Sequence, residues 1–526
     1  MLYSYGINLF VDTLKEASQV KSPRNRLKRL GLWTGPLISA LILAFGDLDP
    51  GHPEVTATLA VASLMAIWWI TEAIPLAVTS LLPVALFPLL GIMDGKETSS
   101  TYFNHVIFLF IGGFIIALAM QKWNLHRRFA LKILRLTGTS PGRILFGFMF
   151  ATCFLSMWIS NTATAMMMIP IVISIISELA KSTGQQEIRK YSIGLLLGIA
   201  YSASIGGVAT LVGTPPNLSF ARIFQIYFPD APEISFASWF FFAIPITVLF
   251  FAIIWLYLYL VFKPAKGQWS GIRTLTIKEE YAKLGKITYE EQVVFIAFIL
   301  VALMWLTRSD INLGSFTLPG WSGLFNKPGF INDGTVAIII GIVLFVIPSK
   351  EHKSRRIMDW KTATRLPWNI VLLFGGGFAL ASGFKESGLS IWIGQHMAGA
   401  LQTHPLIIIL TVSLIMTFLT ELTSNTATTE MLLPILAGMS VSASINPLLF
   451  MLPATLSASM AFMLPVATPP NAIIFGTDRL RIIDMARTGF ILNIIGAILV
   501  TVAVYYWGSV VFDIDINTFP EWARIR

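Results

Sequence analysis

The sequence predicts an all-α polytopic membrane protein that is built from two related halves. Of its 526 residues, 55% are hydrophobic and only 12% are charged, whereas a soluble domain carries about 25% charged residues. Apolar stretches long enough to cross roughly 30 Å of hydrocarbon recur along the chain, and the same short sequence words occur twice in the same order. These observations exclude a soluble protein. A membrane β-barrel would need alternating segments of about ten residues, and the apolar runs here are longer and unbroken.

Two kinds of apolar region predict how the chain crosses the membrane. Simple crossings are expected at 31–47, 54–71, 76–93, 103–121, 236–262, 290–307, 333–349, 366–383 and 489–508. Longer apolar regions at 142–180, 190–226, 404–440 and 446–476 are each interrupted by polar residues or Pro. If the first and third of these are re-entrant helical hairpins and the others are broken crossings, about 11 transmembrane helices plus two hairpins result.

The basic residues predict the orientation of the chain. With a cytoplasmic N-terminus, 30 of the 37 Lys and Arg residues lie on the inner side, which is a strong positive-inside bias. This places a basic N-terminus at 1–30 and a basic loop at 263–289 in the cytoplasm, with an external C-terminus at 509–526. A multi-pass protein of the inner or plasma membrane is therefore expected, without a cleaved signal peptide. Membrane topology explains the net charge of +9 better than nucleic-acid binding does.

Three sequence words are repeated between the halves. They are Phe110–Phe114 with Phe374–Phe378, Ser160-Asn161-Thr162 with Ser424-Asn425-Thr426, and Thr214-Pro215-Pro216-Asn217 with Thr468-Pro469-Pro470-Asn471. In the predicted topology the first hairpin opens from the cytoplasm and the second from outside. The halves are therefore expected to be inverted repeats, and interrupted helices at corresponding positions point to a binding site near the middle of the membrane.

The Ser-Asn-Thr words predict the tips of the two hairpins. These residues favour helix caps and turns over helix interiors. At such a tip the NH groups of a new helix, with the hydroxyls and the Asn amide, can hold a carboxylate, and carbonyls of the preceding helix can hold a cation. Helix packing through hydrogen bonds is the alternative, but two copies in register with a second break favour a binding site.

The Thr-Pro-Pro-Asn words predict breaks in two further helices. Each Pro lacks an NH group, and the residue before it leaves the α region. Gly213 and Ala467 allow close backbone approach just before the prolines, and a sodium ion suits the freed carbonyls; a simple kink is the alternative. There is no Lys or Arg between 144 and 180 or between 405 and 440, so a bound dianion would depend on helix dipoles and co-bound cations. This pattern favours sodium coupling.

The sequence also suggests roles for two acidic residues and for the single cysteine. Glu421 and Glu430 flank the second Ser-Asn-Thr word, and for Glu421 a direct ion-coupling role and a structural hydrogen-bonding role both remain open. Glu430, beyond the second Ser-Asn-Thr word, either alters the charge near the site or faces a cavity. The single Cys153 is expected to serve packing. No catalytic residues are predicted, and an enzyme is not expected; a passive channel would differ by showing flux without saturation.

These motifs resemble those of the divalent anion:sodium symporters, which include bacterial dicarboxylate transporters and mammalian sodium-dicarboxylate and sodium-citrate cotransporters. The resemblance runs from Ile70-Thr71-Glu72-Ala73-Ile74-Pro75-Leu76 through the second Thr-Pro-Pro-Asn word. It implies a homodimer in which a transport domain moves like an elevator against a scaffold. The scaffold helices would lie at 31–137 and 290–402, the transport domain at 142–226 and 404–476, and further membrane helices at 236–262 and 489–508.

The resemblance also implies specific site residues. Substrate would contact Ser160, Asn161, Thr162, Pro215, Ser424, Asn425, Thr426 and Pro469. A first sodium ion would be held by Ser156, Ser160, Asn161 and Gly213, and a second by Thr420, Thr423, Asn425 and Ala467. The expected function is import of a C4-dicarboxylate such as succinate, malate or fumarate with sodium ions. Alternatives on the same fold are a sodium-independent dicarboxylate exchanger and a citrate or sulfate carrier.

Overall fold

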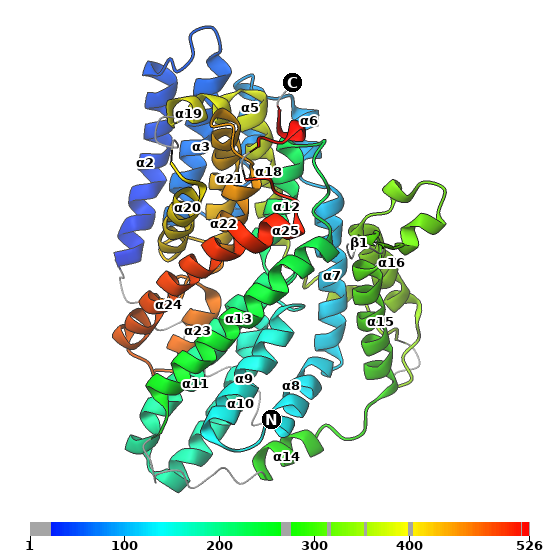
Figure 1. The fold of residues 1–526 in the computed structure, drawn as a ribbon. Coiled ribbons are helices and arrows are strands. Elements are labelled where there is room, and N and C mark those ends of the chain that lie inside the picture. Colours follow the sequence, from blue (N-terminus) through cyan, green and yellow to red (C-terminus); the bar gives the residue numbers. More distant parts are fainter. Residues whose placement is uncertain are drawn as a thin grey trace.

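The computed structural model describes residues 23–264, 275–312, 317–351, 355–397, 403–516 and 518–524, which form an elongated bundle of helices (Figure 1). The helices up to residue 227 are α2 (Pro23–Phe45), α3 (Pro53–Thr71), α4 (Leu76–Thr79), α5 (Leu82–Leu89), α6 (Gly95–Ser100), α7 (His105–Lys122), α8 (Leu125–Thr137), α9 (Pro141–Ser156), α10 (Asn161–Thr183), α11 (Gln185–Val208) and α12 (Pro215–Tyr227).

The remaining helices are α13 (Phe236–Phe262), α14 (Leu275–Ala282), α15 (Tyr289–Leu306), α16 (Asp333–Val346), α17 (Trp360–Ala363), α18 (Trp368–Glu386), α19 (Leu389–Met397), α20 (Pro405–Thr420), α21 (Asn425–Ser442), α22 (Leu448–Ala458), α23 (Pro469–Phe475), α24 (Ile482–Val502), the π-helical η4 (Ala503–Gly508) and α25 (Ser509–Val511). Short 3-10 turns are η1 (Trp321–Leu324), η2 (Pro328–Phe330) and η5 (Glu521–Ala523). Strands β1 (Ile311–Asn312) and β2 (Thr317–Leu318) form one small antiparallel pair.

Local sequence explains where several helices begin. Thr288 and Glu291 form a reciprocal capping box at the start of α15. Asn104 accepts from two backbone NH groups at the start of α7. Pro141 and Pro405 occupy the first positions of α9 and α20, where the missing NH group of proline costs nothing.

The predicted crossings mostly correspond to helices, with one clear difference. Among the described residues, eight helices are long and apolar enough to span a membrane, and five apolar helices are shorter. The crossing predicted at 76–93 is instead two short helices, α4 and α5, separated at Ser80 and Leu81. Each of the four interrupted regions contains two helices, with the break at the predicted Ser-Asn-Thr or Thr-Pro-Pro-Asn word. The breaks were therefore predicted correctly from the sequence.

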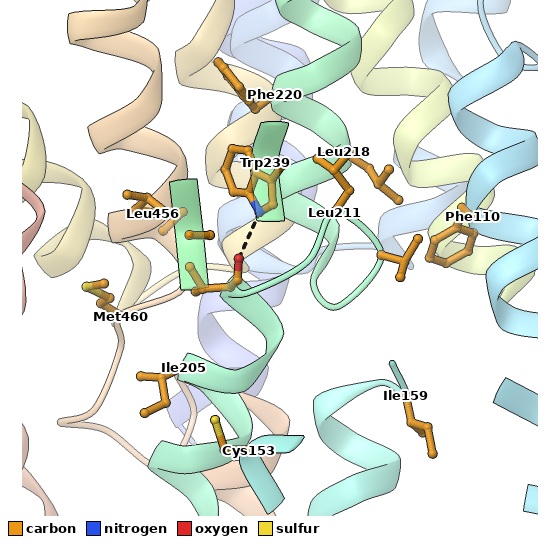
Figure 2. Close-up of a cluster of buried hydrophobic side chains, with 14 of the residues drawn as sticks. Phe110, Cys153, Ile159, Ile205, Leu211, Leu218, Phe220, Trp239, Leu456 and Met460 are labelled. Carbon is orange, nitrogen blue, oxygen red and sulfur yellow. Dashed lines mark hydrogen bonds between the residues drawn. The ribbon is translucent and has the colours of Figure 1, made fainter. Parts of the chain in front are cut away.

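Helix α11 lies at the centre of the packing. Every residue from Tyr191 to Val208 is buried, and the helix packs against α9, α10, α13 and α23. Figure 2 shows the apolar side chains around the end of this helix, with the indole of Trp239 pointing at the backbone. Trp239 Nε1 donates to the carbonyl oxygen of Val208 at 2.9 Å. A tryptophan of α13 thus binds the carbonyl of the last residue of α11.

A salt bridge joins the end of α7 to the segment before α17. Lys122 Nζ donates to Asp359 Oδ2 at 2.6 Å and to the carbonyl of Ile357 at 2.9 Å. Asp359 also caps α17 by accepting from the NH group of Thr362 at 2.8 Å. Hydrogen bonding from Lys122 is the main cause that lowers the pKa of Asp359 to about 2.

This lowered pKa predicts an acid-dependent loss of stability. A carboxylate whose pKa is depressed by folding stabilises the protein fully above its unfolded pKa, about 3.9, and the contribution disappears as the pH falls toward the folded value. We expect Asp359→Asn to lower the thermal unfolding temperature at pH 6 and to match the unsubstituted protein near pH 2. Thermal unfolding of purified protein in detergent across this range measures the effect; a constant gap between the two proteins would contradict it.

Candidate functional site

The tip of the first hairpin brings three oxygen atoms together. Helix α9 ends at Ser156, and α10 begins at Asn161 with Ser160 as its N-cap residue, whose Oγ accepts from the NH group of Ala163 at 3.3 Å. Ser156 Oγ lies 2.6 Å from Asn161 Oδ1 and 2.7 Å from the carbonyl oxygen of Ala203 on α11. The hairpin tip is therefore attached to the helix beside it.

The second hairpin repeats this arrangement. Helix α20 ends at Thr420 and α21 begins at Asn425. Thr420 Oγ1 lies 2.6 Å from Asn425 Oδ1 and 3.0 Å from the carbonyl oxygen of Ala458, the last residue of α22. A hydroxyl has a single proton and serves one acceptor at a time. Each three-oxygen cluster therefore has lone pairs to spare, which is the chemistry of a cation site.

The Thr-Pro-Pro-Asn words begin helices that follow an unwound stretch. Thr214 and Thr468 have extended backbones, with φ and ψ of −143° and 142° and of −136° and 149°. The prolines that follow occupy the first turns of α12 and α23. The stretches 209–214 and 459–468 consequently run without regular helix between α11 and α12 and between α22 and α23.

The asparagine of each Thr-Pro-Pro-Asn word binds backbone carbonyls in the unwound stretch or in the last turn of the helix before it. Asn217 and Asn471 are both fully buried. Asn217 Nδ2 donates at 2.8–3.3 Å to the carbonyl oxygens of Gly207, Val208 and Thr210. Asn471 Nδ2 donates at 3.0–3.1 Å to those of Ala461 and Leu464. Sequence reasoning missed this role, although the repetition of Asn as the fourth letter of both words was a usable signal.

Replacing these amides should disturb the unwound stretches selectively. In Asn217→Asp or Asn471→Asp the donor NH₂ becomes an acceptor, and each buried carbonyl left without a partner costs about 1–3 kcal/mol. We expect the thermal unfolding temperature to fall, because the carbonyls of the unwound stretches lose their fixed positions. Thermal unfolding of the purified variants in detergent measures this. Asn369→Asp, at an exposed asparagine of α18, is the matched control, and equal behaviour of the three variants would contradict the role.

Backbone segments lie very close together beside the first three-oxygen cluster. A Cβ atom added at Gly213 would lie 2.5 Å from the carbonyl oxygen of Gly207, and one added at Gly207 would lie 2.6 Å from Asn161 Oδ1. Gly213 therefore occupies a crowded position, and Gly207 is a second such glycine that sequence reasoning did not single out. Neither position has room for a side chain.

The other predicted site residues lie at or near the same tips. Thr162 and Thr426 occupy the first turns of α10 and α21. Pro215 is half-buried, Pro469 is exposed and Ala467 is buried. Thr423 Oγ1 does not join the Asn425 cluster: it donates to the carbonyl of Leu419 at 2.8 Å and lies 2.5 Å from Thr428 Oγ1.

Comparison with known proteins places the chain in a family. Residues 41–514 match the model of the sodium:sulfate symporter transmembrane region. This chain belongs to that family. Curated relatives from Staphylococcus aureus are named sodium-dependent dicarboxylate transporter SdcS; that of strain bovine RF122/ET3-1 is 46% identical over 511 residues, and that of strain NCTC 8325 is 45% identical, in each case over 96% of both chains. The relatives are transporters, which confirms the prediction of a membrane transporter rather than an enzyme.

Solved structures of transporters share the fold of this symporter-family chain. The YdaH transporter of Alcanivorax borkumensis aligns with a TM-score of 0.52 and 15% identity over 81% of this chain and 89% of its own. MtrF of Neisseria gonorrhoeae, described as illuminating a class of antimetabolite efflux pumps, aligns with a TM-score of 0.53 and 13% identity over 86% and 95%. At these identities the likeness concerns the fold alone.

Glu421 and Glu430 have different surroundings in this symporter-family member. Glu421, next to Thr420, accepts from the NH groups of Met463 and Leu464 at 2.8 and 2.9 Å and from Asn493 Nδ2 at 2.7 Å. These bonds to the second unwound stretch favour the structural role over direct ion coupling.

Glu430 lies at a crossing of three helices. It is fully buried on α21, where its Oε1 accepts a hydrogen bond from the hydroxyl of Ser219 on α12. Its carboxylate also fills the space above Gly377 of α18, where an added Cβ atom would overlap it. Glu430 therefore packs between the helices, and its hydrogen bond is made with α12.

The two halves of the site are in direct contact. Tyr201, two residues before Ala203 on α11, donates its hydroxyl to the carbonyl of Phe462 at 2.9 Å, inside the second unwound stretch. Helix α12 also packs against α21 and α22, and α10 and α11 pack against α23. The first hairpin and the second unwound stretch thus belong to one continuous packed region.

Proposed function

We propose that this protein imports C4-dicarboxylates such as succinate, malate or fumarate together with sodium ions. The observation that carries the proposal is the three-oxygen cluster that is built twice, once at each hairpin tip. Membership in a sodium symporter family and the names of relatives that share almost half of its residues support the same function.

The two clusters are the proposed sodium sites. Sodium is a hard cation that prefers neutral and anionic oxygen ligands. The first site would use Ser156, Ser160, Asn161 and Gly213, and the second Thr420, Thr423, Asn425 and Ala467. Hydroxyl, amide and carbonyl oxygens are available at both tips, and the crowded backbone at Gly213 supports the first assignment. The bonds of Thr423 within its own hairpin support only an indirect part for that side chain.

The substrate would lie between the two hairpin tips. Helices α10 and α21 both begin at the asparagine of a Ser-Asn-Thr word, so their free NH groups and positive dipole ends favour an anion there. We propose Ser160, Asn161, Thr162, Pro215, Ser424, Asn425, Thr426 and Pro469 as the substrate contacts. Because no Lys or Arg lies between 144 and 180 or between 405 and 440, co-bound sodium would supply the compensating charge.

We propose that the binding site moves across the membrane, in a homodimer whose subunits are each built from inverted repeats. Figure 1 shows the α9–α10 pair toward one end of the bundle and the α20–α21 pair toward the other, which supports an inverted relation. In this proposal 142–226 and 404–476 form the transport domain, which moves like an elevator against scaffold helices at 31–137 and 290–402 of a homodimer. About 11 crossings and a cytoplasmic N-terminus complete the arrangement.

Uptake into proteoliposomes tests the function. With purified protein, an inward sodium gradient should drive uptake of labelled succinate well above that in potassium or choline, and unlabelled malate or fumarate should compete while sulfate and citrate should not. Uptake that ignores sodium but requires internal dicarboxylate would replace the symporter by an exchanger. If only citrate or sulfate competed with succinate uptake, sodium-coupled transport would still hold, but the proposed C4-dicarboxylate substrate would be wrong.

A further inference from the structure

A cavity of about 590 Å³ lies beside the first hairpin, on the side predicted to be cytoplasmic. One wall is the hairpin tip, through Ile159, Ala163 and Thr164. The basic wall comes from the end of α7, the start of α8 and the segment around α17, and it carries Lys122, His126, Arg355, Asp359, Lys361 and Arg365. No residue of the two proposed sodium sites lines this cavity.

The basic wall carries uncompensated positive charge. Lys122 and Asp359 neutralise each other in the salt bridge described above. Arg355, Lys361 and Arg365 are exposed, and no carboxylate within the described ranges forms a salt bridge with any of them. A cleft lined by one sign of charge concentrates ions of the opposite sign by roughly 10- to 1,000-fold. This cavity therefore attracts anions.

We propose that this cavity is a second anion site, which holds a dicarboxylate dianion at the cytoplasmic mouth of the transport pathway. The proposal rests on the proposed function. Two guanidinium groups and an ammonium group can bind the two carboxylates of one molecule through charge-assisted hydrogen bonds. The volume lies within the range of small-molecule sites, about 300–1,000 Å³. Because no Lys or Arg lies between residues 144 and 180 of the hairpin, the cationic wall would retain the anion after it leaves the Ser-Asn-Thr words.

The test compares the two faces of the membrane. In inside-out vesicles with sodium in the medium, the triple variant Arg355→Gln, Lys361→Gln and Arg365→Gln should raise the KM for succinate about tenfold. The KM of intact cells, where succinate arrives from the other face, should stay unchanged. The matched control neutralises Lys132, Lys181 and Lys190, exposed residues predicted for the same face but outside this cavity; it should leave both KM values unchanged.

Each result supports or overturns the site. Raising the chloride concentration should increase the vesicle KM of the unsubstituted protein and of the control more than that of the triple variant. Equal KM values for the triple variant and the control in vesicles would overturn the proposal, as would a change confined to intact cells. If the triple variant does not reach the membrane, Arg365→Gln alone is tested against Lys132→Gln by the same criterion. Absence of sodium-driven uptake in the unsubstituted protein would instead refute the proposed function.

Discussion

Asn161→Ala should reduce sodium-driven succinate uptake by at least about 100-fold, the cost of misplacing a group at a tightly built site. Asn161 is the first residue of α10, and its Oδ1 lies 2.6 Å from Ser156 Oγ. Removing the amide takes away a proposed ligand of both sodium and substrate. It also leaves Ser156 with the carbonyl of Ala203 as its remaining partner. Initial uptake rates in proteoliposomes measure the effect.

Two comparisons separate loss of the site from loss of the fold. Asn425→Ala, the equivalent change in the second hairpin, should give a loss of similar size, while Asn369→Ala at an exposed position should have none. Each variant should elute from size-exclusion chromatography as the unsubstituted protein does. Full activity of both Asn161→Ala and Asn425→Ala would remove the basis for the proposed sites.

Gly377→Ala is expected to give the second large effect, because the new methyl group would overlap the carboxylate of Glu430. Glu430 is fully buried between α12, α18 and α21, and the hydrogen bond from Ser219 restrains its carboxylate. Overpacking of this kind costs about 1–3 kcal/mol. In the proposed arrangement α18 belongs to the scaffold and α21 to the transport domain, so uptake should fall more steeply than stability. Uptake rates and thermal unfolding of the same preparation measure both.

Two further variants test this prediction: a control substitution at an equivalent glycine and a double variant that removes the clash. Gly113 occupies the corresponding place in the first Gly-containing word, and a Cβ atom there would make ordinary contact with Val212 at 3.4 Å. Gly113→Ala should therefore be tolerated. Shortening the clashing side chain in the double variant Gly377→Ala with Glu430→Ala should restore part of the lost stability. A double variant no more stable than Gly377→Ala would show that Glu430 is not the obstacle.

The helix breaks could be predicted because their causes are local. Ser, Asn and Thr compete for backbone hydrogen bonds wherever they stand, and Pro excludes the preceding residue from helix. The split between α4 and α5 has a local and a tertiary cause. Pro83, in the first turn of α5, has no NH group to donate to Thr79, the last residue of α4; this local signal was missed. Tyr102 also donates to the carbonyl of Ser80 at 2.5 Å, and Gly376 of α18 packs directly against Ser80. Those two contacts join segments far apart in the sequence and could not be predicted from it.

The partners of the hairpin tips could not be predicted for a related reason. Ala203 and Ala458 complete the two clusters through backbone carbonyls, and an alanine side chain gives no sign of that role. Gly207 is crowded by Asn161 only because α11 passes beside the hairpin. The sequence thus predicts the residue types at the two hairpin tips, whereas the backbone carbonyls beside them depend on which helices are neighbours.

Through the hydrogen bond from Tyr201 to Phe462, ion binding at one proposed site affects ion binding at the other. Tyr201 stands two residues before Ala203 of the first cluster, and Phe462 lies in the unwound stretch beside the second. An ion that orders one of these segments also restrains the other, so the second ion meets a backbone whose ordering is already partly complete. Transport should then rise sigmoidally with sodium concentration, and Tyr201→Phe should make that curve shallower.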